Sequence, residues 1–157
     1  VRDDSYKSQA VRKHEIVQGY LCKEHGRTVR VRIRDHEAFL TIKGKPVTGD
    51  GLQATGNGIA HFEWEKAIEV EDAKQLLRLA LPGLIEKTRW IVPASGRTGR
   101  YFEVDEFHGE NEGLVMAEIE LGSPDEPFDR PSWLGEEVTD DRRYYNGYLA
   151  EHPFKTW

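Results

Sequence analysis

The feature that most constrains the fold is a period-two alternation of apolar and polar residues that recurs along most of the chain. Residues 16–22, 28–34, 39–43, 61–66, 86–92, 101–106 and 116–121 are predicted to be strands on this pattern. Successive side chains of a strand point to opposite faces, so each segment can present one apolar and one polar face. About seven strands with few helices between them favour a mainly antiparallel sheet, closed or nearly closed on itself, over a parallel α/β fold.

Two further segments are predicted to be helices. Residues 71–81 repeat small and apolar side chains at helical spacing, and the Pro-Gly pair at 82–83 ends the run. Thr139 can cap a second helix that opens with two aspartates and runs to about residue 150. The glycine-rich residues 44–60 are expected to form a mobile loop. Since 157 residues suit one hydrophobic core, we expect a single domain, 1–157.

Charge and cysteine content exclude several classes of protein. The net charge of −6 disfavours binding to duplex nucleic acid or to an acidic membrane. The chain has no apolar run of membrane-spanning length and no signal-peptide pattern, and its single cysteine, Cys22, fits a reducing compartment, so we expect the cytoplasm. The sequence also lacks an HExxH zinc motif, a P-loop and a GxSxG elbow. It leaves the oligomeric state open, a homodimer included.

Charged residues recur in pairs, two positions apart, on five of the predicted strands. The pairs are Arg30 with Arg32, Glu63 with Glu65, Lys87 with Arg89, Glu103 with Asp105, and Glu118 with Glu120. Because each apolar face belongs in a core, the charged faces lie together on the other side of the sheet, either in water or lining a tunnel.

Two observations favour the tunnel. First, Phe62, Trp64, Phe102 and Val104 are bulky enough to pack outward against the two predicted helices. Second, rows of Arg and Lys suit phosphate oxygens, whereas clustered carboxylates suit a hard cation such as Mg²⁺ or Mn²⁺. A metal-bound chain of phosphates would satisfy both kinds of charge at once.

An ordered series of motifs resembles a known family over almost the whole chain. The matching segments are Gln18–Leu21, Thr28–Ile33, Phe39–Gly44, Phe62–Glu65, Ile85–Arg89, Glu103–Asp105, Ala117–Leu121 and Gly135–Asn146. They look like the CYTH domain of the triphosphate tunnel metalloenzymes. The resemblance implies an eight-stranded antiparallel tunnel with helices outside, a triphosphate held by basic residues, and one or two divalent ions held by glutamates.

The resemblance also implies roles for residues that match the family's motifs. Phosphate-binding residues would be Arg30, Arg32, Lys43, Lys87 and Arg89, with Arg142 or Arg143 helping from the C-terminal helix. Metal ligands would be Glu118 and Glu120, with Glu63, Glu65 and Asp105 as further ligands or as groups that position water. Lys87, Glu63 and Glu65 would act on the reacting phosphoryl group and the attacking water. Arg34 can equally be a solvated residue.

Two departures from the family pattern stand out. His61 occupies a position where relatives often have arginine, so one basic contact is expected to be weaker or pH-dependent. The family's first strand, Glu-x-Glu-x-Lys, does not occur in this sequence, and Met116 is the only methionine. We therefore expect that strand to lie upstream of Val1.

These observations predict a metal-dependent hydrolase of short phosphate chains, with inorganic triphosphate as the first candidate substrate. Thiamine triphosphatase, RNA 5′-triphosphatase and class IV adenylate cyclase activities remain open within the same resemblance. A different class, a non-enzymatic barrel that binds a phosphorylated ligand or a protein, predicts no metal-dependent turnover.

Overall fold

The computed structural model describes residues 1–45, 62–96 and 99–157. The strands in these ranges are β1 (Arg12–Glu24), β2 (Arg27–Arg34), β3 (Glu37–Gly44), β4 (Phe62–Ile68), β5 (Ile85–Pro93), β6 (Tyr101–Phe107) and β7 (Val115–Ile119). The helices are α1 (Tyr6–Gln9), α2 (Val70–Arg78) and α3 (Asn146–Glu151), with 3₁₀ turns η1 (Gly109–Asn111), η2 (Arg142–Tyr144) and η3 (Phe154–Thr156). Every predicted strand is present, as is the helix predicted at 71–81.

The seven strands form one sheet in the order β4-β3-β2-β1-β5-β6-β7. The pairs β2–β3, β3–β4, β5–β6 and β6–β7 are all antiparallel, which confirms the predicted fold class. This order has two edges, β4 and β7, so the described strands do not close the sheet. Closure by an eighth strand stays a prediction. Most of the loop predicted at 44–60, and His61, lie outside the described residues.

The chain divides into two compact units, which we describe separately. The α2 unit comprises residues 17–84, and the terminal unit comprises residues 1–16 and 85–157. Strand β1 contributes residues to both units. The expectation of a single domain over 1–157 stays a prediction.

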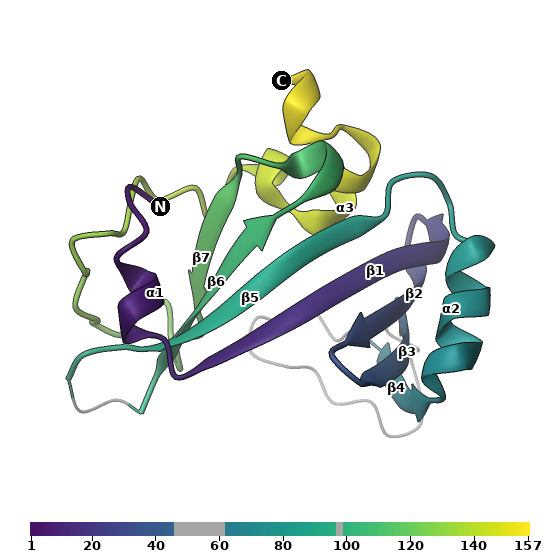
Figure 1. The fold of residues 1–157 in the computed structure, drawn as a ribbon, viewed down its shortest axis with the longest axis horizontal. Helices are drawn as coiled ribbons and strands as arrows, with labels where there is room; N and C mark the ends of the chain where they lie inside the picture. The colour runs from purple at the N-terminus through teal and green to yellow at the C-terminus, as the bar shows by residue number, and fades with distance from the viewer. Residues whose placement is uncertain (46–61, 97–98) are drawn as a thin grey trace. The chain divides into compact units, whose positions relative to one another are not determined.

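In the α2 unit, one face of the sheet is apolar and is covered by α2 (Figure 1). Val31 on β2, Ala38 on β3 and Ala73 on α2 are buried together. Partly buried Leu, Ile and Val side chains surround them, Leu76 and Leu77 of α2 among them. The alternation of β2 and β3 therefore works as predicted: the apolar side chains meet the helix, and the charged ones occupy the other face.

In the terminal unit, β5, β6 and β7 carry an apolar cluster on each face. The first cluster joins Tyr6, Val92, Phe102, Val104 and Trp133, with the Trp133 ring centroid 5.2 Å from that of Phe102. The second joins Ile85, Phe107, Leu114, Leu149 and Ala150. On β6, Glu103 and Asp105 alternate with Phe102 and Val104, so the two acids share their face with the second cluster and not with the first.

The helix predicted from Thr139 to about residue 150 is wrong as a continuous element. The structure has the short turn η2 followed by α3, because Tyr145 lies in extended backbone with φ −76° and ψ 139°. Asp141, rather than Thr139, caps η2: its carboxylate accepts a 3.0 Å hydrogen bond from the backbone N–H of Arg143.

The expected outward packing of the four large apolar residues holds only in part. Phe102 and Val104 are buried, but their partners are Tyr6 and Trp133 rather than a predicted helix. Phe62 and Trp64 remain 38% and 41% exposed, because β4 is an edge strand. Within the described residues, no helix is long and apolar enough to cross a membrane.

Candidate functional site

The charged side chains predicted on β2, β3 and β4 share one face of the α2 unit. Strand register places Thr41 opposite both Arg30 and Glu65, and it places Lys43 opposite Glu63. Directly opposed residues on neighbouring strands lie on the same face. Arg32, two positions from Arg30, lies on this face as well. Since α2 covers the opposite face, we call this set of residues the charged face of the α2 unit.

A small pocket of about 30 Å³ opens on this face. Its lining is polar and basic, from Tyr20, Thr28, Arg30, Thr41 and Lys43. The cationic and hydroxyl groups of this lining suit phosphate oxygens. Across the described ranges Arg30 forms no ion pair, and its only hydrogen bond is a long one, 3.5 Å, to the Thr41 hydroxyl.

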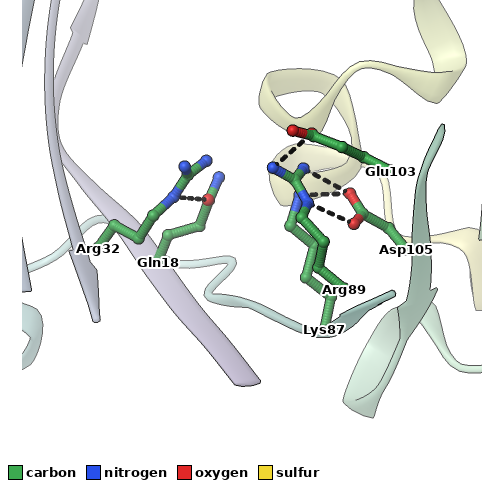
Figure 2. A network of polar contacts seen from close by, with 6 residues as sticks. All are labelled: Gln18, Arg32, Lys87, Arg89, Glu103 and Asp105. Carbon is green, nitrogen blue, oxygen red and sulfur yellow. Dashed lines mark hydrogen bonds and ion pairs between the residues drawn. The ribbon is translucent and has the colours of Figure 1, made fainter. Parts of the chain in front are cut away.

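The terminal unit holds its two predicted cations in a dense network of ion pairs (Figure 2). Lys87 Nζ lies 2.8 Å from Asp105 Oδ2, and Arg89 donates through Nε and Nη2 to the two oxygens of Asp105 at 2.7 and 2.9 Å. Arg89 Nη1 also lies 2.7 Å from Glu103 Oε2. Lys87 and Asp105 are only 1% and 2% exposed. Register explains the network, since Arg89 is directly opposite Asp105 on β6.

The network changes the acid–base properties of both partners. Burial of Asp105 opposes its charge, but the hydrogen bonds from Arg89 and the charge of Lys87 outweigh burial and lower the pKa of this carboxyl. Burial likewise opposes the charge of Arg89, yet Asp105, Glu103 and Glu118 together raise the pKa of the guanidinium. Asp105 and Arg89 therefore both stay charged over the physiological range.

The remaining predicted carboxylates have a different environment. Glu118 lies directly opposite Glu103, and both Glu118 and Glu120 are exposed, as are Glu63 and Glu65 on β4. None of these four, Glu63, Glu65, Glu118 and Glu120, forms a hydrogen bond or an ion pair within the described ranges. Their chemistry fits a hard cation, because they offer only carboxylate oxygens. No group of three metal-binding side chains gathers within the residues that the structure describes.

Asp105, also predicted as a metal ligand or water-positioning group, is placed differently from these four. Its two oxygens already accept three hydrogen bonds from Lys87 and Arg89. This arrangement favours a role in holding the two cations. The metal-binding role of Asp105 stays a prediction that this geometry does not support.

The predicted arginines of the C-terminal segment lie on its surface. Arg143 is bound by Asp141 at 2.6 Å and stacks over the rings of Tyr144 and Trp157. Arg142 begins η2 and is exposed. Arg34 pairs with Glu37 at 3.0 Å on the surface, which suits the solvated role left open above. Whether Arg142 or Arg143 contacts a ligand stays a prediction.

Two buried polar residues of the α2 unit were not singled out from the sequence. Gln18 and Thr41 are 0% and 1% exposed, yet both belong to the polar surroundings of Arg30 and Arg32. Gln18 accepts a 2.9 Å hydrogen bond from Arg32 Nε through its side-chain oxygen (Figure 2). One signal in the sequence could have found Gln18: it lies on the same face of β1 as Ile16 and Tyr20, at the period-two spacing of a strand.

We expect Asp105→Asn to destabilise the protein by about 3 kcal/mol or more at neutral pH, because it removes the anion that the buried Lys87 shares with the half-buried Arg89. Asp105 has a lowered pKa in the native state, so its contribution is present above the unfolded pKa of about 4 and is lost as pH falls through the native pKa. Urea unfolding of both proteins between pH 3 and 7 should thus show the largest difference at pH 7. Asp125→Asn, at an exposed position, is the matched control. A difference that does not change with pH would contradict this assignment.

Comparisons with known proteins identify a family model and relatives that this chain resembles. The profile of the CYTH domain matches residues 3–146. An inorganic triphosphatase of Acetivibrio thermocellus is 41% identical over 100% of this chain and 92% of its own length. An inorganic triphosphatase of Nitrosomonas europaea is 34% identical over 85% of this chain and 82% of its own length.

Among solved structures, the inorganic triphosphatase NE1496 has a similar fold. The two chains superpose with a TM-score of 0.63 and are 30% identical, and the match covers 88% of this chain and 86% of that one. The family profile spans all seven strands described above and all the predicted site residues. The chain therefore belongs to the CYTH domain family.

Proposed function

We propose that this protein is a divalent-metal-dependent hydrolase that cleaves inorganic triphosphate into pyrophosphate and phosphate. Two relatives that match most of the chain are inorganic triphosphatases. The observation that carries the proposal is the charged face of the α2 unit, where Arg30 has no carboxylate partner among the described residues. A half-buried cation without an anion is suited to a ligand that supplies negative charge.

The basic residues would bind and orient the phosphates. Those assigned by motif position are Arg30, Arg32, Lys43, Lys87 and Arg89, with Arg142 or Arg143 as an additional contact. Hydrolysis of a phosphoanhydride needs little covalent help from the protein, because positioning and charge neutralisation supply most of the catalysis. Lys87, held in a fixed place by Asp105, would stabilise the charge that develops on the transferring phosphoryl group.

Membership of the CYTH family implies a divalent metal cofactor, and we propose Mg²⁺ or Mn²⁺. Glu118 and Glu120 would be its main ligands, with Glu63 and Glu65 as further ones, because these exposed carboxylates form no hydrogen bond or ion pair in the described residues. A bound divalent ion would neutralise phosphate charge and polarise a phosphoryl oxygen.

Glu63 or Glu65 would orient the attacking water and accept its proton. The water oxygen forms a bond to the terminal phosphorus, the bridging P–O bond breaks, and pyrophosphate leaves with the electron pair of that bond. Arg30 and Lys43, on the same face as these glutamates, would hold the departing phosphates.

A panel assay of phosphate release tests the proposal. Inorganic triphosphate, thiamine triphosphate and ATP are each incubated with Mg²⁺ or Mn²⁺, and cyclic AMP is measured in parallel. We expect kcat/KM for inorganic triphosphate to exceed the other two by at least about tenfold, and turnover to stop in EDTA. Higher kcat/KM for thiamine triphosphate, or formation of cyclic AMP, would assign another substrate, and no turnover of any compound would favour a non-enzymatic binding protein.

Compartment and assembly are part of the same proposal. The single cysteine favours a reducing environment, so we propose that the protein acts in the cytoplasm. The binding partner expected from the proposed chemistry is a small triphosphate. A homodimer is the assembly that the proposal leaves open.

A further inference from the structure

The buried side chain of Gln18 has an orientation that its neighbour fixes. Gln18 is 0% exposed, and its amide faces Arg32 Nε at 2.9 Å. A guanidinium can only donate, so the amide atom that faces it must be the oxygen. The NH₂ group of Gln18 is consequently turned away from Arg32.

That NH₂ group has no acceptor in the described part of the chain. The Nε2 atom of Gln18 is buried without a hydrogen-bond partner, and so is the Nε atom of Arg30. A buried donor without an acceptor costs about 1 to 3 kcal/mol, so native proteins rarely keep one without a reason. The structure keeps two such donors in one unit, on side chains of the neighbouring strands β1 and β2.

The described groups near these donors cannot easily satisfy them. Arg30 and Arg32 are permanent cations, and Lys43 on the same face adds a third positive charge. The carboxylates of Glu63 and Glu65 lie on this face too, but neither forms a hydrogen bond within the described ranges. The one side-chain acceptor bound by Arg30 is the Thr41 hydroxyl at 3.5 Å. Two unsatisfied donors beside these cations suit a ligand that consists of acceptors alone, which is the property of phosphate oxygens.

We propose that Gln18 is a phosphate-binding residue, whose Nε2 donates a hydrogen bond to an oxygen of the triphosphate held by Arg30 and Arg32. This inference rests on the proposed function and adds a neutral contact to it. Gln18 is sealed from water without ligand, so contact requires a small shift of the half-buried ends of Arg30 and Arg32 toward the anion. Its oxygen would continue to hold Arg32.

Gln18 could instead act only through Arg32, as a positioning residue. The two roles differ in what happens to the side-chain NH₂ group when ligand binds. A contacting donor gains an anionic acceptor, which shifts its proton resonances downfield and slows their exchange with water. A residue that only positions Arg32 keeps its NH₂ group without an acceptor, and these signals stay where they are.

The test uses the full chain and inorganic triphosphate in EDTA, so that binding is measured without turnover. Side-chain NH₂ signals are followed by ¹H–¹⁵N NMR, and those of Gln18 are assigned in the unchanged protein by through-bond correlation with its backbone resonances. We expect the Gln18 signals to move downfield by at least about 0.5 ppm at saturation, as expected for a charge-assisted hydrogen bond. Unmoved Gln18 signals with triphosphate bound would overturn the contact, whatever the variants do.

Variants provide the second arm of the experiment. Gln18→Met keeps the side-chain length and removes the donor, and we expect it to raise the Kd for triphosphate by about tenfold or more. Gln75→Met, the same change on the exposed surface of α2, should leave the Kd within about twofold. Thermal unfolding checks that both variants are folded. If Gln18→Met does not fold, the NMR result on the unchanged protein still tests the contact.

The outcomes separate this inference from the proposed function. Triphosphate binding and hydrolysis by the unchanged protein, with a folded Gln18→Met variant of unaltered Kd, would refute the role of Gln18 alone. If the unchanged protein neither binds nor hydrolyses triphosphate, the proposed function and this inference fail together.

Discussion

Replacing both Glu118 and Glu120 by glutamine is expected to lower metal-dependent triphosphate hydrolysis by about a thousandfold, roughly 4 kcal/mol of barrier, while the fold is retained. Glutamine keeps the shape of each side chain but removes the negative charge that a hard cation requires. Both glutamates are exposed and make no ion pair within the described residues, so their charge contributes little to stability. The measurement is kcat/KM at saturating Mg²⁺, with thermal unfolding as the check on folding.

The matched control replaces Glu110 and Glu112, another exposed pair two positions apart in the terminal unit. This control variant should keep its activity within about twofold, since neither residue belongs to the family motifs or to the charged strands. Full Mg²⁺-dependent turnover in the Glu118 and Glu120 variant would remove both residues from the metal site.

Arg30→Met should separate activity from stability. We expect kcat/KM for triphosphate to fall by about a hundredfold to a thousandfold, the scale seen when one preorganised charge-stabilising donor is lost. The free energy of unfolding should stay within about 0.5 kcal/mol of the original or rise slightly, because Arg30 makes no ion pair in the described ranges and buries an unsatisfied N–H. Steady-state kinetics and urea unfolding provide the two numbers.

Arg78→Met, at the exposed end of α2, is the control for loss of one positive charge and should change neither number. The opposite pattern for Arg30→Met, a large loss of stability with unaltered kinetics, would make Arg30 a structural residue. Arg30 is a sharper probe than Lys87, whose removal would also leave the buried Asp105 short of a partner.

The sequence predicted strands such as β2 and β6 well because one face of each is buried. A one-residue slip would move Val31 or Val104 out of a core, so the period-two pattern specifies both the strand and the face that is buried.

The prediction of one continuous C-terminal helix was wrong for a local reason. Thr139 and the acids after it resemble a helix start, but Tyr145 adopts extended backbone and divides the segment into η2 and α3.

The candidate site could be predicted by residue type but not by pairing. Alternation placed Arg89 and Asp105 on charged faces, yet only the β5–β6 register brings them opposite each other. Without that register, Asp105 resembles a metal ligand as much as Glu118 does. Gln18 lies in a segment that resembles the family, but no role was assigned to it, because a lone amide in a strand has many ordinary explanations. Its significance depends on Arg32 holding its oxygen.

The most direct test of the central claim is ³¹P NMR of inorganic triphosphate incubated with the protein. The account predicts loss of the triphosphate signal in the presence of Mg²⁺ or Mn²⁺, with pyrophosphate and phosphate formed in equal amounts, and no change when EDTA is present. Persistence of intact triphosphate with either ion, while the protein is folded, would contradict it.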